Sequence, residues 1–290
     1  MTDRDTSKRR TWFITGTSSG VGHELALSAL RRGDRVAATA RNTGPLAGLV
    51  SCFPDQVLAV ELDVRDEKAA QLAVKRTMEA FGRIDVVVNN AGYGLFGAVE
   101  ETTDEQVRAI FDTNVFGILN VLRAALPVLR QRRAGHIVQM SSLFGHMSFP
   151  GTGVLAATKH AVAGLTEALA IELNPLGIRC TLVEPAALNT PFMSKAVFAG
   201  AIPDYDQTTG AMLRSLGAVP LESLPSASAV ATLILKAVDA ANPPLLLALG
   251  RSAEDEIRQA LTARLSDLDD WADTTREPDA SILPSSGRRP

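Results

Sequence analysis

The sequence has little of what identifies several classes of protein. It contains only two cysteines, Cys52 and Cys180, with no CxxC pair and no metal-ligand spacing, so neither a disulfide framework nor a metal site is predicted. Its 29 basic and 32 acidic side chains nearly cancel, which provides no basic surface for nucleic acid. No apolar run approaches the roughly 18–20 residues that cross a bilayer, and the charged first ten residues do not resemble a signal peptide. These absences favour a cytoplasmic protein that acts on small molecules.

Short apolar runs alternate with segments of helical periodicity along residues 11–272. The predicted strands lie at 12–15, 36–40, 57–62, 84–88, 136–140, 178–183 and 245–249. The predicted helices lie at 21–32, 66–81, 104–131, 153–173, 226–241 and 253–272. Strands that are apolar throughout are typical of a sheet covered on both faces, and this alternation favours right-handed βαβ units. The sequence therefore predicts an α/β fold: one Rossmann-type, doubly wound parallel sheet of about seven strands with helices on both faces.

Three stretches of the sequence do not follow the alternation of strands and helices. Residues 188–224 contain prolines, glycines and helical patches without a clear strand, and a long insertion after a strand's carboxyl end commonly forms a lid over a ligand. Residues 1–10 are predicted to be disordered, and residues 273–290, rich in Pro, Ser, Gly and Arg, to form a flexible tail.

The first predicted strand runs directly into a glycine-rich turn, Thr15–Gly22, and a helix follows. Gly16 permits a tight turn, Gly20 lets backbone approach a diphosphate, and Gly22 lets the helix pack closely on the strand. Free N–H groups at the start of the helix attract phosphate. The turn predicts a dinucleotide site with contacts from Gly16, Ser18, Ser19, Gly20, Val21 and Gly22.

The end of the second predicted strand indicates which dinucleotide is bound. A site for NAD places an acidic side chain here to bind the ribose 2′-hydroxyl, but no acidic residue occurs between Asp34 and Asp55. Arg41 stands there instead, and a guanidinium suits a 2′-phosphate through bidentate, charge-assisted hydrogen bonds. The sequence therefore predicts NADP(H) as the cofactor.

Further motifs resemble those of the short-chain dehydrogenases/reductases over about residues 10–250. Asp63-Val64 resembles the family's adenine contact, and Asn89-Asn90-Ala91-Gly92 resembles its NNAG motif beside the cofactor. Asn114, Ser142 and Lys159 match three members of the family's catalytic tetrad. The resemblance implies cofactor contacts at Asp63, Val64, Asn90, Ala91, Gly92 and Lys159.

The segment after the sixth predicted strand resembles the family's Pro-Gly-x-x-x-Thr motif with one departure. Pro185 and Thr190 match, and the resemblance implies that they contact the nicotinamide end of the cofactor. Ala186 stands where the family has glycine, so its methyl group is expected to narrow the backbone's approach to the nicotinamide.

The family's fourth catalytic residue, a tyrosine four residues before the lysine, is absent. That position is Leu155, and Ser142 lies thirteen residues before it, which is the family's usual serine-to-tyrosine spacing. The tyrosine is therefore missing rather than displaced. Leucine cannot transfer a proton, and general acid–base catalysis contributes roughly 10²–10⁴-fold. Efficient redox chemistry would need another proton source.

Four side chains are candidates for that source. His146 lies four residues past Ser142 and titrates near neutrality. Lys159, released from its usual neighbour, is expected to titrate low enough to act as an acid. Tyr93 and Tyr205 are better interpreted as substrate contacts. The predicted substrate contacts are Leu143, Leu155, Tyr93, Phe192 and Tyr205.

Several functions remain open at this point. The first is an NADP(H)-dependent reduction of an apolar carbonyl compound, or oxidation of its alcohol, with an altered proton relay. The second is a non-redox enzyme on the same scaffold: a cyclase, isomerase, dehydratase or lyase. The third is an NADP(H)-binding protein without catalysis, and the fourth is that leucine was substituted for an original tyrosine at position 155. The helices near 104–131 and 153–173 resemble those that pair subunits in the family, which implies a homodimer or homotetramer.

Overall fold

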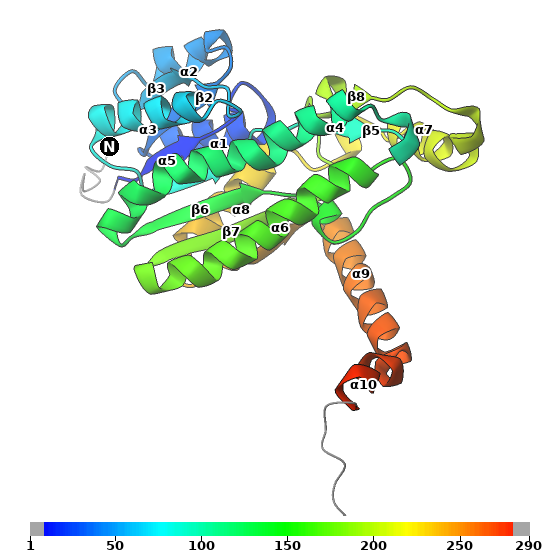
Figure 1. The fold of residues 1–290 in the computed structure, drawn as a ribbon. Helices are drawn as coiled ribbons and strands as arrows, with labels where there is room; N and C mark the ends of the chain where they lie inside the picture. Colours follow the sequence, from blue (N-terminus) through cyan, green and yellow to red (C-terminus); the bar gives the residue numbers. More distant parts are fainter. Residues whose placement is uncertain (1–8, 281–290) are drawn as a thin grey trace, which may run out of the picture.

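The structure, a computed structural model, describes residues 9–280 and centres on a seven-stranded parallel sheet (Figure 1). The strand order is β3-β2-β1-β4-β6-β7-β9. The strands are β1 (Thr11–Ile14), β2 (Arg35–Ala40), β3 (Val57–Glu61), β4 (Val86–Asn89), β6 (Gly135–Met140), β7 (Ile178–Pro185) and β9 (Leu246–Leu249). Because β1 pairs with both β2 and β4, the order of the strands reverses there, and ligands bind at such switch points in open α/β sheets. The predicted Rossmann-type sheet is confirmed.

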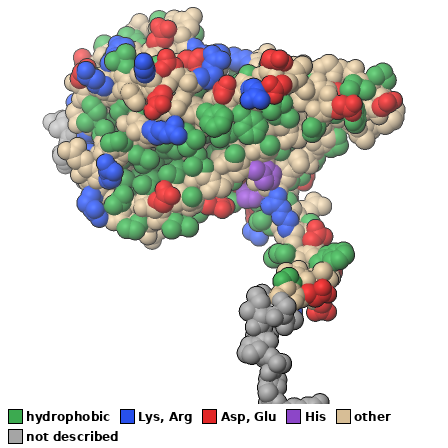
Figure 2. Space-filling model, in the orientation of Figure 1, with side chains coloured by type: hydrophobic (Ala, Val, Ile, Leu, Met, Phe, Trp, Pro, Cys, Tyr) green, Lys and Arg blue, Asp and Glu red, His purple; other side chains and the backbone are tan. Residues whose placement is uncertain are grey.

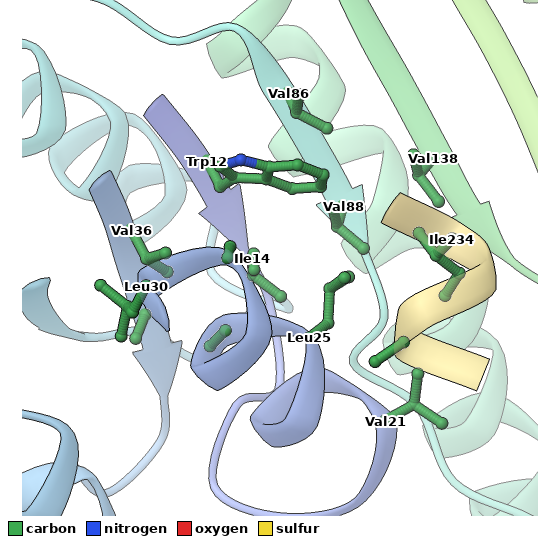
Figure 3. Packing of buried hydrophobic residues seen from close by; sticks show 14 of the residues in the cluster. Trp12, Ile14, Val21, Leu25, Leu30, Val36, Val86, Val88, Val138 and Ile234 are labelled. Atoms are coloured by element: carbon green, nitrogen blue, oxygen red, sulfur yellow. The ribbon is translucent and has the colours of Figure 1, made fainter. Parts of the chain in front are cut away.

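Helices cover both faces of this sheet. On one face lie α1 (Gly20–Arg31) and α8 (Ala227–Asp239), and on the other lie α3 (Glu67–Phe81), α5 (Gly117–Arg132) and α6 (Gly153–Leu173). Trp12 and Ile14 of β1 pack with α1 (Figure 3), whereas Phe13 between them packs into the cluster on the opposite face. Since successive side chains of a strand point to opposite faces, burial on both sides explains why these strands are apolar throughout.

Several short elements were not predicted. The expected helix at 104–131 is divided into α4 (Asp104–Phe111), a π-helical turn (Asp112–Phe116) and α5, and α2 (Ala47–Cys52) follows β2. A second sheet pairs β5 (Leu95–Phe96) with β8 (Val197–Phe198). A strand of two residues is too short to show periodicity in the sequence, yet this pair attaches the segment predicted as a lid to the segment that follows β4.

The C-terminal part departs from the prediction. α9 (Arg251–Asp270) and α10 (Ala272–Ala280) project away from the sheet (Figure 1). Residues of the tail predicted to be flexible from residue 273 are helical as far as residue 280, with Pro278 inside that helix. The rest of this tail and residues 1–8 lie outside the described residues.

Two helical stretches are candidate membrane spans by length and composition, although the sequence was predicted to contain none. Asp104–Arg132 and Gly153–Leu176 are long and apolar enough by length and composition. In each, however, 44% of the most apolar window is buried inside the protein, since both stretches pack against the sheet. Apolar core helices of globular proteins have the same length and composition.

Candidate active site

A cavity of about 900 Å³ opens where β1, β4, β6 and β7 end. This volume lies in the range of known ligand sites. Most of the residues predicted for cofactor and substrate line it: Gly16, Ser18, Ser19, Gly20, Val21, Arg41, Asp63, Val64, Asn90, Ala91, Gly92, Tyr93, Ser142, Leu143, Leu155, Lys159, Pro185, Thr190 and Phe192. Four predicted residues are not among those that line it: Gly22, Asn114, His146 and Tyr205.

The glycine turn is held against the end of β4 by one amide side chain. Asn90 Nδ2 donates to the carbonyl oxygens of Thr15 at 2.8 Å and of Gly16 at 3.1 Å. Gly16 has a φ of +70°, and a Cβ on Gly22 would lie 2.4 Å from Asn90 Nδ2. Glycine is needed at both positions, for backbone conformation at Gly16 and for close packing at Gly22.

The turn and its surroundings fit a dinucleotide phosphate. The first turn of α1 contains no acidic residue, and the Ser19 side chain makes no capping hydrogen bond. The N–H groups at the start of α1 therefore lack a protein counter-charge, which suits an anion. Arg41, exposed just after β2, lines the same cavity. Thr190 lies against Gly20, 3.7 Å from where a Cβ on that glycine would be.

A second arginine, Arg65, lies at this end of the cavity and was not among the predicted contacts. Arg65 donates to both carboxylate oxygens of Asp63, at 3.0 Å from Nε and 2.6 Å from Nη2. The Arg65 side chain holds the pKa of Asp63 below its ordinary value, and the charge of Arg41 adds to this effect. The Asp63 carboxylate, predicted to contact adenine, is thus engaged by a neighbour two residues along the chain, a spacing visible in the sequence.

Asn114 does not face the cavity but organises its wall. It lies in the π-helical turn, its Oδ1 accepts from the Tyr93 amide at 3.1 Å, and its Nδ2 donates to the Tyr93 carbonyl at 3.0 Å. Nδ2 also lies 3.3 Å from Thr158 Oγ1 on α6. Single π-type turns are frequent at functional sites. Here the turn joins the segment after β4 to the helix that carries Lys159.

Leu155 and Lys159 lie one turn apart on α6 in very different surroundings. Leu155 is 1% exposed and packs with Leu95, Phe96 and Ile110. Lys159 Nζ donates to the Met140 carbonyl at 3.0 Å. Burial lowers the pKa of Lys159 to about 8, although the Glu184 carboxyl opposes this shift. A lysine with such a pKa carries its proton at neutral pH and can release it.

Ser142 begins the loop beside this lysine. Its Oγ accepts from the Phe144 amide at 3.3 Å, and the side chain lines the cavity. Since a hydroxyl is also a donor, the Ser142 O–H can hydrogen-bond to a substrate oxygen.

The positions of His146 and Tyr205 argue against their predicted roles. His146 Nε2 lies 2.8 Å from Glu184 Oε2, and both residues are buried outside the cavity wall. Burial lowers the pKa of His146 and raises that of Glu184 to about 8. The Tyr205 hydroxyl donates a hydrogen bond to Glu100 at 2.6 Å, and Tyr205 is not among the residues that line the cavity.

The segment at 188–224 supplies much of the apolar wall. Its lining residues are Leu188, Thr190, Pro191, Phe192, Met193, Lys195, Val197, Met212, Leu216, Val219, Leu221 and Leu224. The sequence predicted contacts from Thr190 and Phe192 and placed Met193 in an apolar cleft. It did not indicate the others, because a segment without regular periodicity does not reveal which side chains point inward.

The chain belongs to the family described as short chain dehydrogenase, whose pattern matches residues 10–199. Oxidoreductase BOA17 of Botryotinia fuckeliana is 37% identical over 262 residues, which cover 90% of this chain and 96% of that protein. A short-chain dehydrogenase from Streptomyces avermitilis has a TM-score of 0.87 and 36% identity, over 93% of this chain and 99% of that structure.

Two other solved structures contain dinucleotides. ElxO with NADP bound has a TM-score of 0.70 and 28% identity, over 83% of this chain and 96% of that chain. A short-chain dehydrogenase/reductase from Burkholderia phymatum in complex with NAD has a TM-score of 0.74 and 26% identity, over 97% and 98% of the two chains. The similar structures thus include complexes with either nicotinamide dinucleotide.

The packing of the glycine turn generates the first prediction. Gly22→Ala places a methyl group 2.4 Å from Asn90 Nδ2 and 2.6 Å from the Gly16 carbonyl oxygen. We expect the free energy of unfolding in urea to fall by about 1–3 kcal/mol and dinucleotide affinity to weaken. Gly48→Ala in α2, where nothing lies within 4 Å, is the control and should stabilise by about 0.4–1 kcal/mol. Equal behaviour of the two variants would contradict the packing argument.

Proposed function

We propose that the protein is an NADP(H)-dependent oxidoreductase that interconverts an apolar carbonyl compound and its alcohol. The proposal depends on one observation: the glycine turn and Arg41 share a single cavity with Ser142, Lys159 and a set of apolar side chains. The family and the NADP complex of ElxO support the cofactor. The apolar side chains that line the other part of the cavity are Phe96, Leu143, Phe144, Phe149, Leu155, Phe192, Met193, Met212 and Leu216.

Because position 155 is leucine and not tyrosine, another side chain must transfer the proton. When bound, the reduced cofactor supplies a hydride to the carbonyl carbon. The oxygen then needs a proton, which we assign to the Lys159 ammonium, while the Ser142 hydroxyl donates a hydrogen bond to the same oxygen. In the reverse direction the neutral Lys159 amine accepts the alcohol proton. The apolar wall excludes water and so strengthens both polar interactions.

The packing of Leu155 favours a second candidate, a non-redox enzyme on the same scaffold. Leu155 is a fully packed member of an apolar cluster, so the position fits leucine well. Turnover of a substrate without a change in nicotinamide absorbance would support this alternative, and binding without turnover would support a cofactor-binding protein.

We also propose a homodimer or homotetramer in the cytoplasm. Hydrophobic side chains lie over the outer surface of α5 and α6 (Figure 2). Ile171 of α6 is 78% exposed, and Phe116, at the end of the π-helical turn before α5, is 52% exposed. Apolar exposure of this kind marks association surfaces. The molar mass in solution tests the subunit number, and a monomer would contradict it.

The cofactor assignment is tested by titration calorimetry with NADPH and NADH. Arg41→Ala should weaken NADPH binding roughly 10–100-fold, the loss expected for a charge-assisted hydrogen bond, and leave NADH affinity unchanged. Arg76→Ala on the exposed face of α3 is the matched control. Absence of heat with either dinucleotide in the unsubstituted protein would overturn the proposed function.

The role of Lys159 predicts a pH dependence of opposite sign in the two directions. The Lys159 ammonium loses its proton above about pH 8, so kcat/KM for carbonyl reduction should fall as pH rises through that value, and alcohol oxidation should rise. Lys159→Met should lower kcat at least 100-fold and remove this titration from the profile. Unchanged turnover in a variant that still binds NADPH would eliminate Lys159 as the acid.

Restoring the missing hydroxyl gives a further prediction. Leu155→Tyr should raise the rate of carbonyl reduction at least tenfold, within the range of general acid catalysis. Leu155→Phe is the control, since it adds the ring without the hydroxyl and should not raise the rate. Loss of a native activity on Leu155→Tyr, with no gain in reduction, would mean that leucine serves a different reaction.

A further inference from the structure

A lysine from the segment at 188–224 reaches the glycine turn. Lys195 Nζ donates to Ser19 Oγ at 2.6 Å, although the two residues are 176 positions apart in the sequence. Both side chains line the cavity. No motif that the sequence offered involves Lys195, so its position at the turn is a property of the folded chain alone.

The segment that carries Lys195 is fixed at both ends. Before it, the Asn189 amide donates to the Pro225 carbonyl at 2.9 Å. After it, the Val197 amide donates to the Gly94 carbonyl at 2.8 Å, where β8 pairs with β5. Because these contacts already order the backbone, less conformational entropy remains to be lost when the lysine binds a ligand.

The charges around Lys195 indicate that the missing partner is an anion. An ammonium has three donors, and the Ser19 hydroxyl, a neutral acceptor, engages one. Among the side chains of residues 9–278, no carboxylate lies within salt-bridge distance of Lys195 Nζ. The positive end of the α1 dipole, without an acidic residue in its first turn, adjoins the same spot. Two positive groups that meet in a ligand-sized cavity without compensation favour binding of negative charge.

We propose that Lys195 is a ligand of the cofactor's diphosphate, so that dinucleotide binding fastens the segment at 188–224 over the cavity. The inference rests on the proposed function, which supplies the dinucleotide. The diphosphate is expected over the start of α1, where Thr190 passes Gly20 and Lys195 meets Ser19. The 2′-phosphate is left to Arg41. Lys195 and Arg41 therefore recognise different phosphates of one molecule.

The test compares dinucleotide affinities by titration calorimetry. Lys195→Met should raise Kd for both NADPH and NADH at least tenfold, because the diphosphate is common to the two and the contact is charge-assisted. Lys195→Arg should retain most of the affinity. Lys68→Met, which removes an exposed lysine at the start of α3, should bind as the unsubstituted protein does.

Each result has a distinct meaning. Equal affinities of Lys195→Met and the unsubstituted protein would overturn the proposal and leave the proposed function standing. Weaker binding of NADPH alone would also overturn it, since Lys195 would then be a 2′-phosphate ligand. Failure of the unsubstituted protein to bind either dinucleotide would instead defeat the proposed function. Circular dichroism of Lys195→Met checks that this exposed substitution leaves the fold intact.

Limited proteolysis provides a second readout that affinity alone does not. NADPH at saturating concentration should protect residues 188–224 of the unsubstituted protein from cleavage, and protection should fall several-fold in Lys195→Met at equal cofactor occupancy. Equal protection would contradict the coupling between lysine and cofactor.

Discussion

The arrangement of the site depends on how closely the start of α1 approaches the end of β4. Asn90 closes this gap by donating to two carbonyl groups of the glycine turn, and the missing side chain of Gly22 leaves room for the amide. The turn is therefore fixed by the segment that follows β4 as well as by its own conformation at Gly16. The segment after β4 continues from Asn90 through Gly92 to Tyr93, and the Tyr93 amide donates a hydrogen bond to Asn114. The same segment therefore contacts both the nucleotide end and the catalytic end of the cavity.

Leu155 contributes an apolar side chain to the same helix, α6, that carries Lys159. A tyrosine would place a polar hydroxyl at the cavity wall, whereas Leu155 extends an apolar cluster one helical turn from Lys159. A charge surrounded by apolar groups is poorly solvated, so its protonated form is destabilised. The Met140 carbonyl is the one hydrogen-bond acceptor recorded for the Lys159 ammonium among the described residues. Burial thus lowers the pKa of Lys159 to about 8, close to the value that an acid acting near neutral pH requires.

The fold and the nucleotide end of the site were predictable because both depend on local patterns of residue types along the sequence. Continuous apolar strands reflect burial on two faces, and the glycine spacing reflects conformations that only glycine tolerates at low cost. The proton relay was harder to predict. His146 looked available because it follows Ser142 in a loop, but the sequence gives no sign that Glu184, 38 residues away, binds its ring. Contacts between distant segments, such as Lys195 with Ser19, carry no local pattern at all.

The three cations of the nucleotide end differ in how they are held, and this difference bears on what each can do. Arg65 is committed to Asp63 through a bidentate pair, so it positions that carboxylate. Arg41 directly follows β2, and its exposed side chain lines the cavity. Lys195 belongs to the segment at 188–224, outside the seven-stranded sheet. Its hydrogen bond with Ser19 joins this segment to the glycine turn at the cavity wall. A ligand that engages both Arg41 and Lys195 contacts one residue attached to the sheet and one in the segment at 188–224. Of these two contacts, only the one with Lys195 can hold this segment against the glycine turn.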